Sequence, residues 1–541
     1  MKLSDYIAKR LLAYGVDHVF MITGGGAMHL NDSLGKCKGM NYVCNHHEQA
    51  SAIAAEGYAR TSGKVAVVVV TTGPGGTNTL TGVIGQWFDS VPVLYISGQV
   101  KYETTTASCP SVRLRQLGDQ ELNIVNIVRP ITKYAVMVQD PQHIRYHLEK
   151  ALYLATHGRP GPVWLDIPLN VQGAQIEERE LLGYDPREDE LVFDENELRQ
   201  KTFRVIEMLK QSERPVFVAG HGIRVSEGQD VFFRVAEHMK IPVLSTFNGF
   251  DLVESEHPLS IGRIGTIGNR AGNFALQNAD LLLSVGSRNN IRQVSYNWAD
   301  YARNAAKIIV DIDPAELQKP TLKPDLAVWS DARLFLEHLG RGLQKERLPD
   351  WTDWLAWCHE RKRRYPPVLA EHTNRKGAVD LYYFNHVLTS LLKKDAVVVA
   401  GNGSACIGLF QAGIVKRGQR MFWNSGCAGM GYELPAAIGA CLARGKREVI
   451  CLAGDGSLQF NIQELQTVVH HRLPIKIFYL NNQGYTSIKQ TQDSMFGGAR
   501  VGADPSSGVT FPDILKLAKA YGLKTVVLNS HKDMQNKIKK I

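Results

Sequence analysis

Short runs of β-branched and other apolar residues, each ending in a turn, recur along the whole chain of 541 residues. Stretches with helical periodicity separate these runs. This alternation is typical of parallel α/β domains, because a crossover helix must return the chain to the start of the next parallel strand. The runs that we expect to form strands are 65–70, 91–97, 163–167, 215–219, 281–285, 307–313, 396–400, 448–453 and 475–480.

Two polar stretches divide the chain into blocks. The first covers 177–197 and the second 351–376. A chain of this length has room for three to four domains of roughly 150 residues each. We therefore expect an α/β protein of three doubly wound parallel-sheet domains, with boundaries near 1–175, 190–340 and 375–541.

Composition excludes several classes of protein. Hydrophobic residues make up 44% of the chain and charged residues 21%, which excludes disorder. The net charge of +9 is spread thinly, and its densest cluster, 361–364, reads as a solvated helix face or loop, so we expect no nucleic-acid partner. The eight cysteines form no Cys-x-x-Cys pair, and no apolar run is long enough to cross a bilayer. These features predict a protein of the reducing cytoplasm that does not bind membranes.

The most specific local pattern joins two strand ends. The sequence Gly454-Asp455-Gly456-Ser457 follows one expected strand, and Asn481-Asn482 follows the next. The 27 positions that separate Asp455 from Asn482 accommodate one turn, one crossover helix and one returning strand. Adjacent parallel strands therefore bring both side chains to the sheet edge where ligands of such domains bind.

These residues suit a metal bound to a diphosphate. Ser457 is expected to cap the crossover helix, whose exposed N–H groups favour a diphosphate. A carboxylate, an amide oxygen and a backbone carbonyl near Gly484 are hard ligands that suit Mg²⁺, which prefers to share substrate phosphates. Gly-Asp-Gly alone is usually only a tight turn, but the asparagine pair at this spacing favours a functional site.

The combination resembles the motif of thiamine diphosphate (ThDP) enzymes, in which Gly-Asp-Gly is followed at a similar interval by Asn-Asn. The resemblance implies Asp455, Asn482 and Gly484 as Mg²⁺ ligands. It also implies that Gly454, Gly456, Ser457 and Asn482 bind the cofactor. The three blocks would then be the pyrimidine-binding, central and diphosphate-binding domains of that family.

The first block contains the glutamate that this chemistry needs. The sequence Asn45-His46-His47-Glu48-Gln49-Ala50 resembles the catalytic-glutamate helix of acetolactate synthase-like ThDP enzymes. In that family, a carboxyl group beside the aminopyrimidine ring promotes removal of the cofactor's C2 proton. A lone glutamate on a helix is ordinarily a solvated charge, but Glu48 opens a helix rich in small residues.

The resemblance extends through nearly the whole chain. Thr72-Gly73-Pro74-Gly75-Gly76-Thr77-Asn78 is similar to a family turn, and Asp119-Gln120-Glu121 is similar to a Phe-Gln-Glu pattern. Gln120 would then orient the substrate, with an ordinary surface glutamine as the alternative. Met430 would wedge between the two cofactor rings, although on its own it would read as a core methionine. The other cofactor contacts implied are Gly73, Pro74, Gly403, Ser404, Gly429 and Tyr485.

The middle block also resembles the family's central domain, which binds FAD in several branches and is vacant or binds another nucleotide in others. FAD is therefore a candidate cofactor. Gly220 and Gly222 lie at the end of an expected strand, but a Gly-x-Gly pattern alone is weak. The four residues implied for FAD are Gly220, Gly222, Arg288 and Asp311.

Three departures from the family concern the substrate and the C-terminus. Thr491 stands where acetolactate synthases carry a tryptophan that helps select the second keto acid. The turn Gly401-Asn402-Gly403-Ser404-Ala405 lacks the polar Gln-His pair of the family. The third block is also short by one strand and a tail relative to the family pattern.

The resemblance implies decarboxylation of a 2-keto acid, pyruvate first among them, followed by transfer of the acyl unit to a carbonyl acceptor. It also implies a homodimer or homotetramer with active sites at the subunit interface. Three alternatives stay open: a carboligase that takes a keto sugar or another large acceptor, a decarboxylase or lyase that releases an aldehyde, and a non-catalytic homologue. A flavin or nicotinamide dehydrogenase is disfavoured, because it leaves Asp455 and Asn482 unexplained.

Overall fold

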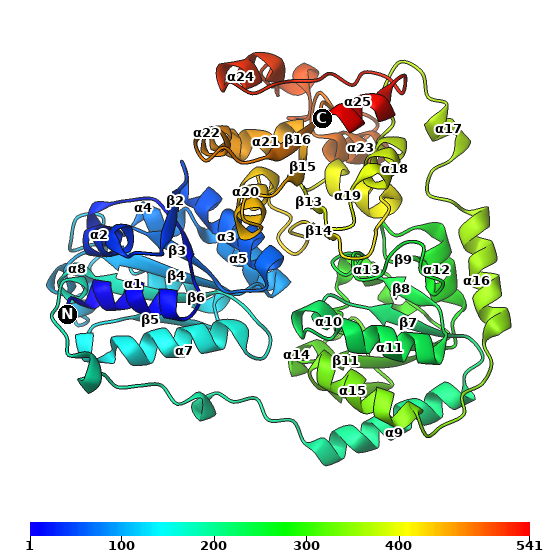
Figure 1. Ribbon diagram of the computed structural model, residues 1–541, viewed down its shortest axis with the longest axis horizontal. Helices are drawn as coiled ribbons and strands as arrows, with labels where there is room; N and C mark the ends of the chain where they lie inside the picture. The colour runs from blue at the N-terminus through cyan, green and yellow to red at the C-terminus, as the bar shows by residue number, and fades with distance from the viewer. The chain divides into compact units, whose positions relative to one another are not determined.

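The computed structural model describes residues 1–541 (Figure 1). The chain forms two compact units. The first comprises 1–190, 397–404 and 423–525, and the second comprises 191–396, 405–422 and 526–541. Three parallel sheets run through them, which confirms the predicted fold class. No helix is both long and apolar enough to span a bilayer.

The first unit opens with a six-stranded sheet in the order β2-β1-β3-β4-β6-β5, in which all neighbours are parallel. Its middle strands are apolar and buried on both faces, as parallel strands covered by helices must be. The strands are β1 His18–Met21, β2 Asn41–Cys44, β3 Ala66–Val70, β4 Val93–Gln99, β5 Tyr134–Met137 and β6 Val163–Pro168. The helices are α1 Leu3–Ala13, α2 Met28–Lys36, α3 Glu48–Ser62, α4 Pro74–Thr77, α5 Leu80–Asp89, α6 Ile124–Val128, α7 Ile144–Thr156 and α8 Leu169–Gln172.

The same unit holds a second parallel arrangement, in which β15 lies between β13 and β16. Gly454 at the end of β15 pairs with Leu480 at the end of β16, so Asp455 and Asn482 leave neighbouring strands at one edge, as predicted. The strands are β13 Val397–Ala400, β15 Val449–Gly454 and β16 Ile475–Leu480. The helices are α20 Glu433–Ala443, α21 Asp455–Leu458, α22 Leu465–His470, α23 Thr486–Met495 and α24 Ile514–Ala520.

Helices α3 and α20 pack against each other at close range (Figure 1). A side chain at Gly57 would collide with the carbonyl of Ala436, and one at Gly439 would collide with the carbonyl of Ala54. The small residues of both helices are therefore needed for this contact. Because higher residue numbers on α3 meet lower ones on α20, the two helices are antiparallel.

The second unit contains a six-stranded parallel sheet in the order β12-β11-β10-β7-β8-β9. Its strands are β7 Pro215–Ala219, β8 Val243–Ser245, β9 Ser260–Arg263, β10 Leu281–Val285, β11 Ala306–Asp311 and β12 Leu326–Trp329. Its helices are α9 Glu195–Gln211, α10 Gly222–Val225, α11 Gln229–Met239, α12 Arg270–Asn278, α13 Ile291–Val294, α14 Pro314–Gln318, α15 Ala332–Leu343, α16 Thr352–Arg364, α17 Ala370–Thr373, α18 Leu381–Leu391 and α25 Met534–Lys540. Helix α19 Ser404–Ala412 and strand β14 Arg420–Phe422 complete the chain.

The predicted strands are all present, and their ends differ from the prediction by at most two residues. One local prediction is wrong. Ser457 does not cap a long crossover helix, because the first helical turn is only α21, its N-cap is Gly454, and the chain then bends at Asn461 inside the 3₁₀ segment Gln459–Glu464. The Ser457 hydroxyl instead hydrogen-bonds outside this helix.

Candidate active site

The carboxyl ends of β15 and β16 form the centre of the site. Asp455 is almost fully buried there, and its carboxylate accepts hydrogen bonds from the backbone N–H of Gly456 (2.8 Å) and of Gly484 (3.1 Å). Burial raises the pKa of Asp455, while these backbone N–H groups act in the opposite direction. The contact with Gly484 shows that the two predicted metal-binding segments meet.

Asn482 faces the loop that follows β13. Its side-chain amide donates to the Ser404 hydroxyl at 3.1 Å. This bond brings the predicted metal segment next to the loop 401–404 (the diphosphate loop), which holds the predicted cofactor contacts Gly403 and Ser404. On the other side, the Lys489 ammonium donates to the backbone carbonyl of Asn482 at 3.0 Å. Ser487 on the same helix lies 3.6 Å from the position that a Cβ would take at Gly403. Helix α23 therefore flanks the diphosphate loop.

The donor set fits Mg²⁺ better than a transition metal. No group of three or more His, Cys, Asp or Glu side chains is arranged to hold a metal ion. The available ligands are the Asp455 carboxylate, the Asn482 side-chain amide and the Gly484 backbone carbonyl. Mg²⁺ binds proteins through one or two carboxylates and takes its remaining ligands from water and substrate phosphates. The residues therefore suit Mg²⁺ that is also bound to a diphosphate. Without the diphosphate they would bind the metal weakly.

Ser457 joins this centre to the loop that carries Met430. Its hydroxyl donates to the buried Glu433 carboxyl (2.8 Å) and accepts from the backbone N–H of Gly431 (2.9 Å). The Asn402 amide donates to the carbonyl of Gly429 at 2.7 Å, so the loop is held on both sides of Met430. The Met430 side chain is 36% exposed, which excludes an ordinary core methionine.

A buried ion network fixes the beginning of the same loop. Arg60 bridges Glu56 (2.8 Å) and Asp89 (2.7 Å), and all three side chains are buried. Asp89 also accepts from the backbone N–H groups of Ser425 and Gly426. Because a buried charge left without its partner is costly, this network holds the loop in one arrangement.

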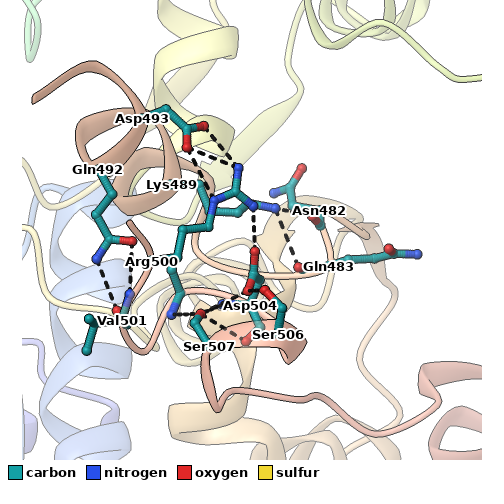
Figure 2. A network of polar contacts seen from close by, with 11 residues as sticks. Asn482, Gln483, Lys489, Gln492, Asp493, Arg500, Val501, Asp504, Ser506 and Ser507 are labelled. Carbon is teal, nitrogen blue, oxygen red and sulfur yellow. Dashed lines mark hydrogen bonds and ion pairs between the residues drawn. The ribbon is translucent and has the colours of Figure 1, made fainter. Parts of the chain in front are cut away.

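An Arg-centred network braces the metal segment (Figure 2). Arg500 pairs with Asp493 on α23 (3.0 Å) and with Asp504 (2.5 Å), so the loop after α23 folds back on that helix. The loop then presents the carbonyl of Ala503 to the backbone N–H of Tyr485 at 2.9 Å. Gln483 and Gly484, which precede Tyr485, both have positive φ angles. The brace therefore supports a strained segment that supplies two of the three predicted metal ligands.

We expect Arg500→Gln to weaken Mg²⁺-dependent cofactor binding about three- to tenfold, because Arg500 only orients the segment of the predicted ligands and its ion pairs are partly exposed. Calorimetric titration of ThDP in the presence of Mg²⁺ measures this. Arg187→Gln is the matched control, since it removes an exposed bidentate pair with Asp185 that touches none of the site. Equal affinities of the two variants would show that the brace has no role in binding.

Glu48 opens α3, with His47 as its N-cap through a hydrogen bond from the backbone N–H of Gln49. The Glu48 carboxylate is half-buried and accepts from the Asn78 side chain at 3.0 Å. Asn78 follows α4, the short helix that begins at Pro74 directly after Gly73. The hydrogen bond therefore joins the predicted catalytic glutamate to the turn that is predicted to contact the cofactor.

Within one chain, the packing of α3 on α20 separates Glu48 from Glu433 and its neighbour Ser457. Since α3 and α20 are antiparallel with Gly57 against Ala436, Glu433 lies opposite Arg60, which is twelve positions after Glu48. At 1.5 Å per residue, Glu48 is about 18 Å along the helix axis from Glu433. Glu433 contacts Ser457, two residues from Asp455.

Gln120 lies in an exposed loop and has a φ angle of 61°, which is unusual for a residue other than glycine. Its carbonyl accepts from the Thr72 hydroxyl at 3.3 Å, and Gly73 leaves room for that carbonyl. The structure therefore places Gln120 beside the Gly73–Pro74 turn.

The four residues predicted for FAD share the carboxyl edge of the second unit's sheet, at the ends of β7, β10 and β11. There the backbone N–H of Gly222 donates to the carbonyl of Gly286 at 2.8 Å, and a side chain at Gly220 would collide with the same carbonyl. The packing of two loops thus explains both glycines without a ligand. Asp311 accepts from the backbone N–H of Asp313, and the carbonyl of Arg288 accepts from Lys319.

Several residues of the site were not predicted. Asn402, Glu433, Lys489 and Arg500 each read as an ordinary polar residue in the sequence, and only the fold brings them to the site. Glu433 is the most buried of them, and burial raises its pKa to about 7. The one available signal is the position of Glu433 three residues after Met430, a residue that the family resemblance implies for the site.

Comparison with known proteins matches three parts of the chain to the domains of one enzyme family. Residues 1–127 match the N-terminal TPP binding domain of thiamine pyrophosphate enzymes, 203–339 match the central domain, and 401–541 match the C-terminal TPP binding domain. Thiamine pyrophosphate (TPP) is another name for ThDP.

Three similar proteins match along nearly their whole length. The acetolactate synthase large subunit of Lactococcus lactis is 33% identical over 99% of this chain and 90% of its own length. The probable acetolactate synthase large subunit of Methanocaldococcus jannaschii is 31% identical over 100% and 89%. Acetolactate synthase isozyme 3 large subunit of Escherichia coli is 30% identical over 99% and 91%. The chain belongs to the thiamine pyrophosphate enzyme family and is a ThDP-dependent enzyme similar to acetolactate synthase large subunits.

Proposed function

We propose that this enzyme decarboxylates a 2-keto acid, pyruvate first among them, and joins the acyl unit to a carbonyl acceptor. The observation that carries the proposal is the meeting of Asp455, Gly484 and Asn482 at the ends of β15 and β16, beside the loop of Gly403 and Ser404. The names of the related synthases support the same reaction.

The chain's own residues have distinct tasks in this proposal. ThDP supplies a nucleophilic carbon that can attack a keto acid and stabilise the charge left by decarboxylation. Asp455, Asn482 and the carbonyl of Gly484 would hold Mg²⁺. Glu48 would share a proton with the aminopyrimidine ring, Met430 would contact the cofactor, and Gln120 would orient the keto acid.

We also propose that the active site forms between two copies of the chain. The separation of about 18 Å along the axis of α3 keeps Glu48 away from the Asp455 region of its own chain. In a symmetric dimer, Glu48 of each copy can lie at the Asp455 region of the other copy, so that both residues contribute to one site. A dimer of dimers satisfies the same requirement.

Product analysis tests the reaction. With pyruvate, ThDP and Mg²⁺, we expect carbon dioxide together with a carboligation product such as acetolactate. Acetaldehyde as the sole organic product, with or without added aldehydes and ketones, would favour a simple decarboxylase. Absence of any turnover despite cofactor binding would favour a non-catalytic homologue.

A larger acceptor is the second candidate, and one observation favours it. Thr491 is exposed on α23, the helix that flanks the diphosphate loop through Ser487. A threonine at this position leaves more room than the family's tryptophan. In a competition between a second pyruvate and a keto sugar, transfer mainly to the sugar would support this candidate, and transfer only to pyruvate would contradict it.

FAD in the central domain remains a proposal, supported by the location of Gly220, Gly222, Arg288 and Asp311 at one sheet edge. If it binds, we expect the purified protein to be yellow and to show flavin absorbance that is released on denaturation. A colourless protein that stays colourless after incubation with FAD would contradict it.

A further inference from the structure

Gln120 combines an exposed side chain with a strained and firmly held backbone. Its φ angle of 61° costs energy for a residue with a Cβ. The Thr72 hydroxyl nevertheless holds its carbonyl at 3.3 Å, and a Cβ at Gly73 would lie only 2.6 Å from that carbonyl oxygen. An ordinary surface glutamine needs no such constraint, so the backbone strain requires an explanation.

The constraint originates in Gln99, a fully buried residue at the end of β4. Its amide oxygen accepts from the backbone N–H of Val100 (3.0 Å) and from the Thr72 hydroxyl (2.5 Å), whose single proton is shared with the more distant Gln120 carbonyl (3.3 Å). Its amide nitrogen donates to the carbonyl of Leu122 (2.9 Å) and to the Asp166 carboxyl (3.0 Å). Both donors and both acceptor positions of the amide are therefore used, which leaves it a single orientation.

Asp166 fixes that orientation of the Gln99 amide. It is fully buried, and its second oxygen accepts from the Ser97 hydroxyl at 2.6 Å, while Ser97 accepts from the Trp164 indole at 2.8 Å. Burial raises the pKa of Asp166 to about 7. Because the Asp166 carboxyl accepts from the Gln99 amide nitrogen, the Gln99 amide oxygen faces Thr72.

Gln99 touches the loop 101–123 at Gln120 and directly after it. It contacts Leu122 directly and reaches the Gln120 carbonyl through Thr72. The loop is otherwise mostly exposed and lacks long helices, and its interior is held by Glu121, which accepts from Thr106 and Leu117. A loop of this length within a compact domain is usually functional.

We propose that Gln99 is a positioning residue for Gln120. Through Thr72 and Leu122 it fixes the backbone at Gln120 and directly after it, and so determines where that side chain stands for the 2-keto acid. The substrate part of this inference rests on the proposed function, whereas the mechanical part concerns the loop alone.

Gln99→Met tests the inference against Gln86→Met. Both glutamines are fully buried, but the Gln86 side chain hydrogen-bonds to the Ala52 carbonyl and the Tyr95 hydroxyl, neither of which belongs to the loop. We expect amide hydrogen exchange in 101–122 to accelerate about tenfold or more in Gln99→Met, since it loses more than one hydrogen bond, and to stay unchanged in Gln86→Met. We also expect KM for the keto acid to rise about tenfold in Gln99→Met, with ThDP affinity unchanged.

Thr72→Val and Thr72→Ser keep the test valid if Gln99→Met fails to fold. Valine has nearly the shape of threonine but lacks its hydroxyl, so we expect the same faster exchange and higher KM, and serine should restore both. Unchanged exchange in 101–122 on loss of the Thr72 hydroxyl would overturn the mechanical role. Faster exchange with an unchanged KM would overturn the positioning of Gln120 for substrate. If the wild-type enzyme has no turnover, the proposed function fails while the exchange measurement still decides the mechanical part.

Discussion

Glu48→Gln should abolish turnover while leaving Mg²⁺-dependent ThDP binding within about twofold of wild type. Glutamine keeps the size of the side chain and can still bond to Asn78, whose amide lies 3.0 Å from the Glu48 carboxylate. It cannot share a proton with the cofactor, and general acid–base groups typically contribute 10²- to 10⁴-fold to the rate, so we expect a loss of at least about 100-fold.

Steady-state kinetics and calorimetry on the same preparation measure these two effects. Glu178→Gln in the exposed linker of the first unit is the matched control, and it should keep full activity. Activity near the wild-type value in Glu48→Gln would contradict the proposed role of this residue.

Asp455→Asn should have the second large effect, on cofactor binding itself. Asparagine removes the negative charge and replaces one acceptor oxygen by a donor, which opposes the N–H of Gly484 or of Gly456. Loss of groups that merely orient a metal ligand already costs 10- to 100-fold in metal affinity, so loss of this carboxylate should cost at least about 100-fold.

Calorimetric titration of ThDP with Mg²⁺ measures the loss. Asp194→Asn is the control, because Asp194 caps α9 in the second unit and asparagine is an equally good N-cap. ThDP binding that is as tight in Asp455→Asn as in wild type, and still sensitive to chelators, would place the metal elsewhere.

The features that the sequence predicted are those that follow from the geometry of parallel sheets. The spacing of Asp455 and Asn482 requires one crossover, and adjacent strands then bring their ends together, as Gly454 and Leu480 do. The position of Glu48 at the start of a helix was likewise predictable from its neighbours.

Other features depend on contacts between distant segments, which spacing does not determine. The antiparallel packing of α3 on α20 separates Glu48 from Asp455, and nothing in either helix alone indicates its direction. The brace through Arg500 requires the loop to fold back on α23, and the hydrogen bonds of Gln99 join four segments. The error at Ser457 has a similar cause, since its hydroxyl hydrogen-bonds to Glu433 and Gly431, two residues distant in the sequence.

Mixing two inactive variants tests the central claim, that a ThDP site forms from Asp455 of one copy and Glu48 of another. Glu48→Gln and Asp455→Asn are to be co-expressed with different tags, or refolded together, and the activity compared with that of each variant alone. In a random dimer mixture, half of the dimers are mixed, and each mixed dimer has one site with both wild-type residues. The account therefore predicts about a quarter of the wild-type activity. A mixture as inactive as its two components would contradict it.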